Sequence, residues 1–486
     1  MPNALAYTML MIWPLVTLAL FRRMPIERAI VWTMLGGYLL LPPVANFDLP
    51  LVPAMNKYSI ATLSAFAMCC ILAPDKLRIW HGSIIVRILL LLFVLGVIPT
   101  VLNNREPIVF EAITNSAPIH FVSFFIPGLS LRDVLSVMIG QIIVLLPFLL
   151  GRSYLATETG MREALLALVI GALFYSLPAI IETLIGPIIN IKIYGFFQHD
   201  FRQMIRGNGF RPVVFLHHGL WMAFFFVTAV LAAAALFRTS AQKDRMRWGL
   251  IVFYILIVLR ACKSLASWSY GLALTPLVLF LGKKTLIRIS VAMALLAVSY
   301  PMLRNAELLP LDKMVAFAER IDEDRAQSLE FRFDNEEQLL ARAGEKRIFG
   351  WGGWGRNFVH DPRTGERRTI PDGNWIIVFG TFGWIGYIAQ MGLLSLPILV
   401  LFGQMQTQRQ DEMSPYAAPI VLILAVTMID MLINDTLTPY TWLCAGAVLG
   451  HVESLRYPSG HAQRNRLRKD PVIGGTRATE RPKSIL

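Results

Sequence analysis

Charged residues are scarce in this chain of 486 residues: Asp, Glu, Lys and Arg make up 16% of it, against 55% hydrophobic residues. Apolar runs of the roughly 20 residues that a membrane-spanning helix needs recur along its whole length. The composition is typical of a polytopic membrane protein and argues against a string of soluble domains. The net charge of +13 does not indicate nucleic acid as a partner, because most basic residues flank apolar runs, as is usual in membrane proteins.

Metal and nucleotide motifs are also missing. The four cysteines, Cys69, Cys70, Cys262 and Cys444, lie in or beside apolar runs, with neither metal-ligand spacing nor a disulfide framework. The chain has no His-Glu-x-x-His pair, P-loop, nucleophile elbow or EF-hand loop. We therefore expect neither a metal site nor a cofactor.

What is present is a series of apolar segments, and we predict an all-α fold: a polytopic transmembrane helical bundle of about 12–13 spans. The first segment has no basic region before it and no cleavage site after it, so we expect a retained helix and not a removed signal peptide. The candidate spans are 4–21, 29–45, 58–73, 84–102, 134–150, 163–185, 213–237, 248–260, 268–281, 286–303, 374–402, 416–434 and 439–453.

Basic residues occur in every second connector, and the positive-inside rule places those connectors in the cytoplasm. We expect four parts: residues 1–303 form the N-terminal transmembrane helices, 304–373 a long extracytoplasmic loop between the tenth and eleventh spans, 374–453 the C-terminal transmembrane helices, and 454–486 a basic cytoplasmic tail. The N-terminus then lies outside with the long loop. We expect the tail to be disordered and to contact anionic membrane lipids.

Two connectors on the outer side are basic against this rule. They are Gly186–Pro212, with Arg206 and Arg211, and the turn Arg260–Ser264, with Lys263. A bound anionic ligand explains the charge simply, since arginine can bind phosphate oxygens with two parallel hydrogen bonds. The alternatives are ion pairs with buried carboxylates, of which Glu182, Asp430 and Asp435 are candidates, or a position among lipid headgroups.

Further candidates come from sequence position. His217 and His218 follow Arg211 directly, and we expect both in the first turns of the next helix; His217 is a candidate for substrate binding. Arg260 and Lys263 are three residues apart, which is about one helical turn. The segment 105–132 is too short to span and contains Pro-Gly, so we expect a re-entrant or interfacial helix on the outer face.

The long loop is the only long polar segment in the chain. Residues 311–321 and 328–342 show the periodicity of amphipathic helices. Glu330 and Arg332 are two residues apart and do not share a face of a regular helix. Trp351 and Trp354, in a glycine-rich stretch, offer flat apolar rings for the faces of sugars, or serve as interfacial anchors.

Taken together, these stretches resemble the O-antigen ligase and polymerase superfamily of bacterial polytopic membrane glycosyltransferases. Three motifs carry the resemblance: Arg206–Gly219 entering a span, the turn Arg260–Ser264, and Glu330-x-Arg332 followed by a glycine-rich return to the membrane at Trp375–Gly386. The likeness covers roughly residues 130–450, and each motif is degenerate. Many members have His-Asn at the loop's return, where this chain has Asp372-Gly-Asn374-Trp375; the nearest loop histidine is His360.

The resemblance implies a fold similar to the GT-C class and a metal-independent, inverting glycosyl transfer on the outer side of the bacterial cytoplasmic (inner) membrane. The donor is a glycan on undecaprenyl pyrophosphate, and the acceptor is a glycan or a lipid. Without a metal, fixed cations must offset the charge of the leaving pyrophosphate, and Arg211, Arg260, Lys263 and Arg332 are the candidates. For the catalytic base the order of preference is Asp372, Glu330, His360.

Because the ligase-type histidine is absent from its place, an exopolysaccharide or O-antigen-like polymerase is favoured over a ligase that transfers O-antigen to lipid A core. A non-enzymatic flippase or other transporter of lipid-linked sugars remains an alternative. It predicts polar residues deep in many spans, whereas here they crowd towards the outer ends. A chain-length regulator or another polysaccharide-assembly protein is an expected partner.

Overall fold

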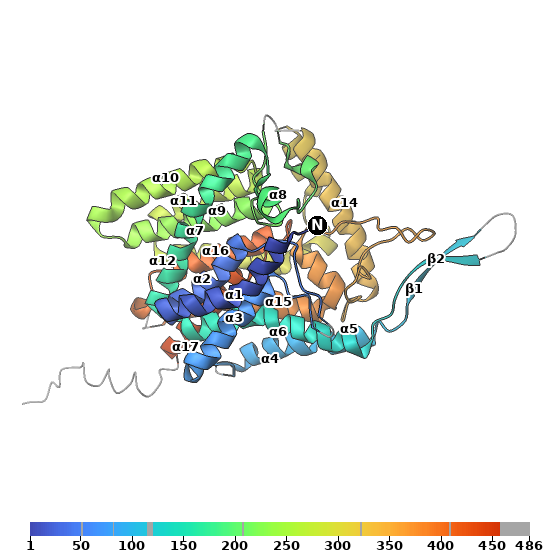
Figure 1. The fold of residues 1–486 in the computed structure, drawn as a ribbon, viewed down its shortest axis with the longest axis horizontal. Coiled ribbons are helices and arrows are strands. Elements are labelled where there is room, and N and C mark those ends of the chain that lie inside the picture. The colour runs from blue at the N-terminus through green and yellow to red at the C-terminus, as the bar shows by residue number, and fades with distance from the viewer. Residues whose placement is uncertain are drawn as a thin grey trace, which may run out of the picture.

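The structure is a computed structural model that describes residues 1–49, 52–80, 82–113, 120–206, 209–320, 323–407 and 410–456. Its fold is mostly helical, with one small two-stranded sheet in the described ranges (Figure 1). All but three residues of the predicted tail, 454–486, lie outside the described residues.

A helix occurs at each of the thirteen predicted segments, although several boundaries differ by a few residues. The predicted span 84–102 is two helices, α4 and α5, which meet at Gly96. The amphipathic helices predicted in the long loop are confirmed as α13 and α14. In chain order the α-helices are α1 Ala4–Arg23, α2 Ile26–Leu40, α3 Lys57–Leu72, α4 Ile84–Leu95, α5 Val97–Leu102, α6 Leu131–Tyr154, α7 Glu158–Ile185, α8 Ile189–Tyr194, α9 Gly219–Thr239, α10 Arg245–Ala261, α11 Leu265–Phe280, α12 Lys283–Asn305, α13 Leu311–Glu319, α14 Glu323–Glu345, α15 Asn374–Met405, α16 Ala417–Asp430 and α17 Pro439–Arg456.

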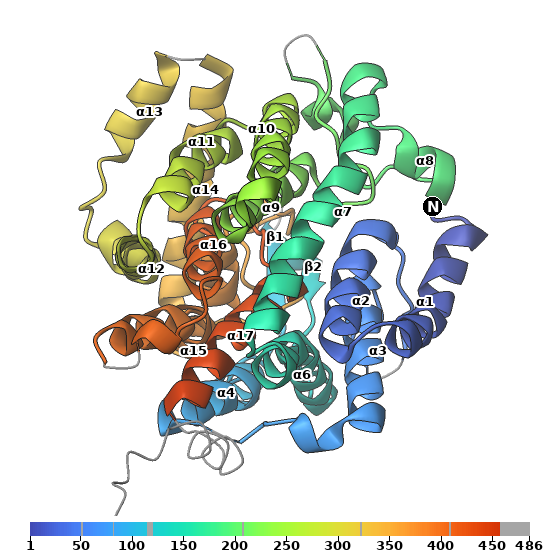
Figure 2. The same cartoon turned by 90° about the vertical axis from the view of Figure 1, so that its left-hand side faces the viewer.

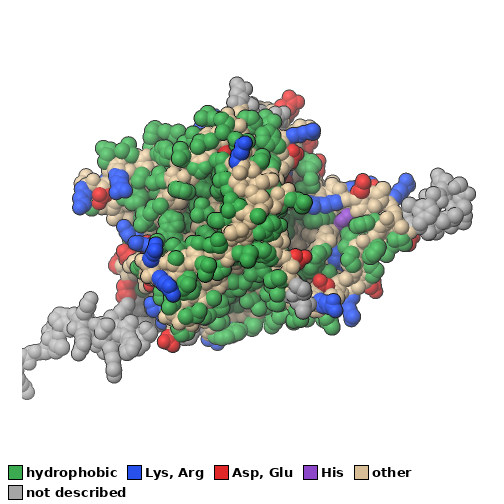
Figure 3. Space-filling model, viewed as in Figure 1, with side chains coloured by type: hydrophobic (Ala, Val, Ile, Leu, Met, Phe, Trp, Pro, Cys, Tyr) green, Lys and Arg blue, Asp and Glu red, His purple; other side chains and the backbone are tan. Residues whose placement is uncertain are grey.

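Seven helical segments of the described chain are long and apolar enough to cross a membrane: α1, α4 with α5, α6, α7, α9, α12 and α15. Three further apolar helices, α3, α11 and α16, are shorter. Apolar side chains cover the middle of the face in Figure 3, and Lys and Arg gather towards its two ends. The fold is thus an all-α bundle of the kind that membrane proteins form.

The two ends of the bundle differ. The hairpin of strands β1 (Ile108–Ile113) and β2 (His120–Ile126) projects at one end of the long axis, and the connector between α9 and α10 lies at the other (Figure 1). Seen along the bundle in Figure 2, α9 and α16 are surrounded by other helices. Most of their residues are buried, so these two helices form the centre of the core.

The prediction of a re-entrant or interfacial helix in 105–132 is wrong, because this segment contains the antiparallel hairpin β1–β2. β-branched and aromatic residues dominate both strands, and such residues favour extended backbone. The base of the hairpin is held from the long loop, since Arg356 donates to the carbonyl oxygens of Pro127 (2.8 Å) and Glu106 (2.9 Å).

Helix α15 is two arms that meet at Gly383, whose φ of 63° and ψ of −160° are not helical. Gln390 Nε2 donates to Asn374 Oδ1 over 2.5 Å, so the two arms lie side by side although these residues are sixteen apart. Only glycine fits the bend, because a Cβ at this position would lie 2.4 Å from the backbone of Ile348. The fold therefore places Asn374, the first residue of α15, inside the bundle.

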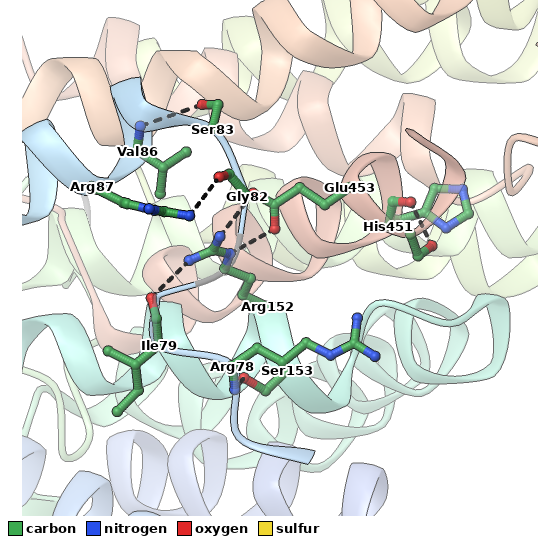
Figure 4. Close-up of polar contacts among 11 residues, drawn as sticks. Arg78, Ile79, Gly82, Ser83, Val86, Arg87, Arg152, Ser153, His451 and Glu453 are labelled. Carbon is green, nitrogen blue, oxygen red and sulfur yellow. Dashed lines mark hydrogen bonds and ion pairs between the residues drawn. The ribbon is translucent and has the colours of Figure 1, made fainter. Parts of the chain in front are cut away.

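Helices α6 and α17 pack closely and are joined by a buried ion pair (Figure 4). A Cβ on Gly446 would lie 1.9 Å from the carbonyl oxygen of Phe148, so glycine allows this approach. Beyond it, Arg152 Nε and Nη2 donate to the two Glu453 carboxylate oxygens at 2.7 and 2.8 Å. Arg152 Nη1 also donates to Ile79 O at 3.3 Å, which fastens the α3–α4 connector.

We expect Arg152→Met to lower the free energy of unfolding by about 3–5 kcal/mol, because it leaves the Glu453 carboxylate without its partner at a buried position. Thermal unfolding in detergent micelles measures the effect. Arg162→Met is the matched control, since the Arg162 side chain is half exposed and 3.9 Å from Glu163. If Arg152→Met and Arg162→Met melt alike, the ion pair does not stabilise the bundle.

Candidate functional site

The candidate site lies where several helices begin. His218 caps α9, because its Nδ1 accepts a hydrogen bond from Leu220 N (3.0 Å), and Ser264 caps α11. Helix α3 starts at Lys57 behind the cap Asn56, and α15 starts at Asn374. Helix N-termini carry partial positive charge, so several of them around one site favour an anion.

The two basic connectors meet at this site. Lys263 Nζ donates to Arg206 O at 2.9 Å, and Arg211 Nη2 donates to Lys263 O at 3.3 Å. Lys263 does not continue helix α10, because its φ is +53°. Burial lowers the pKa of Lys263, and the nearby charge of Arg260 lowers it further. Arg211 reaches the site because Gly219 has no side chain; a Cβ there would lie 2.3 Å from the stem of Arg211.

Glu182 holds the first of these connectors without pairing with an arginine. Its buried carboxylate accepts from Val213 N and Val214 N, both at 2.8 Å, and from Ile189 N at 3.0 Å. Val214 has a φ of +51°, which is strained for a β-branched residue. Glu182 therefore fixes the backbone that leads from Arg211 to α9.

From the long loop, Arg332 of α14 enters the same region. Its Nε lies 3.3 Å from Asp372 Oδ2, and its Nη1 donates to Ile433 O (3.1 Å) and Asn434 Oδ1 (3.3 Å). One turn later Glu336 fastens α14 to the bundle: it accepts from Tyr300, Arg304 and Trp375 at 3.0, 3.1 and 3.3 Å. A small hollow is lined by Arg332, Glu336 and Asp372.

Beneath this pair is a polar network that joins α15 to the end of α16 and is buried except at Asp435. Asn434 and Thr436 donate to the two carboxylate oxygens of Asp430, at 3.0 and 2.6 Å. Asn374 Nδ2 donates to Asp435 Oδ1 at 2.7 Å. The surrounding protein desolvates the Asp435 carboxylate and so raises its pKa, and the hydrogen bond from Asn374 offsets part of that effect. Both carboxylates are thus satisfied by amides and a hydroxyl.

His218 connects the two halves of the site. Burial first, then the charges of His199, Arg211, Arg332 and Arg206, lower its pKa to about 3. The ring is therefore neutral at pH 7, with its proton on Nε2, because Nδ1 accepts from the backbone. His199, Arg206 and Arg211 belong to the first basic connector and Arg332 to α14, so this connector and α14 both lie near His218.

His217 lies on the other side of this turn, against Tyr58 and Trp221. Burial and the neighbouring Lys57 lower the pKa of His217 to about 3. The expectation that both histidines fall in the first turns of α9 is wrong: α9 begins at Gly219, with His218 as its cap. Ahead of Arg206, the connector forms only a short 3-10 helix, Phe201–Met204.

The three short apolar helices each have one end at this site: α3 at Lys57, α11 at Leu265 and α16 at Asp430. At about 1.5 Å per residue they are about 21–24 Å long, less than the roughly 30 Å of a bilayer's hydrocarbon core. Helix α7, with 28 residues, is much longer.

Three candidates lie apart from this centre or at its edge. Arg260 is exposed near the end of α10, beside Lys263. Glu330 is exposed on α14 while Arg332 points inward, as their spacing predicts. His360 packs its ring 5.5 Å from Phe110 of the hairpin, and its Nδ1 lies 3.1 Å from Phe358 O.

The two tryptophans of the long loop differ from each other. The ring of Trp351 is covered by Arg342, whose Cζ lies 3.3 Å from the ring centre, and its Nε1 donates to Arg342 O. Trp354 is 58% exposed, has a φ of +56°, and borders a hollow of about 430 Å³ between α5, α6 and the bend of α15. Of these two tryptophans, Trp354 is the one whose ring is open to a ligand.

Sequence reasoning missed His218, Glu336, Asn374 and Gln390 as parts of the site. The capping role of His218 had a weak signal, since it directly precedes a glycine and an apolar run. Glu336 follows Arg332 by four residues, which places both on one helix face. Nothing in the sequence pairs Asn374 with Gln390, because that contact depends on the bend at Gly383.

Fold and site together define a helical membrane-type bundle with a cationic centre at the N-termini of several helices. No protein-family model matches the chain, and no curated protein matches its sequence. Membership of the O-antigen ligase and polymerase superfamily therefore stays a prediction from the motifs described above.

Proposed function

We propose that the protein is a membrane glycosyltransferase that polymerises undecaprenyl-pyrophosphate-linked oligosaccharides on the outer side of the bacterial cytoplasmic membrane. The observation that carries the proposal is the convergence of Arg206, Arg211, Lys263 and Arg332 near the N-termini of α9 and α11. Fixed cations and helix N-termini stabilise a pyrophosphate that gains charge as it leaves. Topology, with these groups outside, comes from the positive-inside rule.

The ion pair of Arg332 and Asp372 suggests how binding activates the base. Before the donor binds, the Asp372 carboxylate occupies one edge of the Arg332 guanidinium. A pyrophosphate competes for that guanidinium, because arginine binds phosphate oxygens strongly. Displaced from Arg332, Asp372 is free to accept a proton. The Asp372 side chain is 35% exposed, whereas Asp430 is buried and accepts from an amide and a hydroxyl. Asp435 is exposed, but its carboxylate accepts from Asn374 and does not pair with Arg332 in the described residues.

The reaction then runs in one displacement. An acceptor hydroxyl attacks the anomeric carbon of the donor glycan, and the bond from that carbon to the pyrophosphate oxygen breaks. The electron pair leaves with the lipid pyrophosphate, which the cations hold, and the hydroxyl proton goes to the Asp372 carboxylate. Configuration at the anomeric carbon inverts. The neutral Nε2–H of His218 adds a hydrogen-bond donor at the same site.

Purified protein in nanodiscs, given undecaprenyl-pyrophosphate oligosaccharide, is expected to produce longer glycans on a gel in the presence of EDTA, because the cations take the place of a metal ion. Addition of lipid A core as acceptor separates the ligase alternative from the polymerase. If EDTA stops the reaction, the metal-free mechanism is wrong. If no glycan lengthens while lipid-linked substrate crosses vesicles, the protein is a transporter.

A further inference from the structure

A cluster of aromatic rings lies beside the cationic centre and plays no part in the chemistry described so far. Tyr38 of α2, Tyr58 of α3 and Trp221 of α9 are mutual neighbours, with ring centres 6.3–6.5 Å apart and planes tilted by only 24–30°. His217 packs against Tyr58 (5.7 Å) and Trp221 (5.4 Å). These four rings form a broad aromatic surface, and Tyr58, Trp221 and His217 are each only partly buried.

The hydroxyl group of Tyr58 is buried and lacks a hydrogen-bond partner among the described residues. The neighbouring Lys57 does not serve it, because Lys57 Nζ donates to Phe215 O at 2.9 Å and lies over the Tyr58 ring. Buried hydroxyls in proteins nearly always have a partner, and a water molecule or a ligand hydroxyl can serve as one here.

The aromatic surface adjoins the place proposed for the pyrophosphate. His217 and His218 are consecutive, and His218 lies in the field of Arg206, Arg211 and Arg332. Tyr58 is also close enough to Asp435 to interact with its charge. Asp435 belongs to the polar network beneath Arg332 and Asp372. A group attached to a pyrophosphate held by those arginines is therefore carried onto this surface.

We infer that the aromatic surface of Tyr38, Tyr58, Trp221 and His217 binds the sugar ring that is bonded directly to the pyrophosphate of the donor. This inference rests on the proposed function. A pyranose offers an apolar C–H face for the rings and hydroxyls at its edge, one of which completes the hydroxyl of Tyr58. The surface is distinct from the predicted platform in the long loop, where Arg342 covers Trp351.

The test compares two ligands on the full-length protein in nanodiscs: bare undecaprenyl pyrophosphate, and the same lipid carrying the oligosaccharide used in the gel assay. Trp221→Leu is expected to raise the Kd of the sugar-bearing lipid about tenfold and to leave that of the bare lipid unchanged. Trp221→Phe is expected to restore most of the affinity. Tyr58→Phe keeps the ring and removes the hydroxyl. It is expected to lower the affinity for the sugar-bearing lipid only. Trp80→Leu, at an exposed tryptophan, is the control.

The results divide clearly. Selective loss of affinity for the sugar-bearing lipid in Trp221→Leu and Tyr58→Phe supports the inference. If the affinities for both lipids fall equally, or if neither affinity changes, the inference is overturned while the proposed function stands. If the wild-type protein binds neither lipid, the proposed function fails, and the inference fails with it. Melting temperatures of the variants identify any that do not fold, and Tyr58→Phe, the smallest change, keeps the comparison decisive.

Discussion

Replacement of Arg332 by alanine is expected to lower the rate of glycan transfer by about 10²–10³-fold while the protein still inserts and folds. Arg332 lies between the cations of the two basic connectors and Asp372, so its loss removes charge from the leaving pyrophosphate and frees Asp372 from its partner. The gel assay at saturating donor measures the rate. Helix α14 keeps its place in the variant, because Glu336 anchors it through Tyr300, Arg304 and Trp375.

Two further variants sharpen this result. Arg332→Lys keeps the positive charge but not the planar fork, so an intermediate rate is expected if two parallel hydrogen bonds to the phosphate matter. Arg320→Ala removes an exposed arginine from the same loop and is expected to leave the rate unchanged. If Arg332→Ala loses affinity for the donor but turns over at the normal rate, Arg332 binds the ground state and the transition state equally and does not accelerate the chemical step.

The second large effect is expected for Asp372→Asn, which should lower the rate about 10²–10⁴-fold, the usual contribution of a general base. Asparagine has nearly the same shape but cannot accept the acceptor's proton. Glu330→Gln and His360→Gln are the matched comparisons, because the structure places Glu330 on an exposed face and His360 against the hairpin. A loss of rate in His360→Gln and not in Asp372→Asn would assign the base to His360.

The pH dependence of the rate provides a separate check on Asp372. Burial raises the pKa of Asp372 above its ordinary value of 3.8, and Arg332 offsets part of the rise. Because the base acts as the carboxylate, the rate is expected to fall as the pH drops through this raised pKa. Displacement of Arg332 by pyrophosphate moves the fall to higher pH. His217 and His218 add no step between pH 5 and 8, since their pKa values are lowered to about 3.

Much of the fold followed from local pattern. Apolar runs predicted where helices lie, and the amphipathic periodicity of the long loop predicted α13 and α14, because burial of apolar faces determines both. The hairpin β1–β2 was not predicted, because the apolar residues and the Pro-Gly of segment 105–132 also fit an interfacial helix. Its base is held by Arg356, more than 200 residues away in the chain. A contact between such distant residues leaves no local signal.

The candidate site divides in the same way. The sequence identified Arg206, Arg211 and Lys263, because charge beside apolar runs on the outer side needs an explanation, and the family resemblance added Arg332 and Asp372. That these residues lie near one another was decided by the tertiary structure, in which the connectors contact each other and the bend at Gly383 brings Asn374 inward. The sequence likewise marked Trp351 as open to a sugar, whereas packing of α14 covers it with Arg342 and leaves the rings around Trp221 accessible. Residue type determines what a side chain can bind, but only packing decides which side chains stay free to do so.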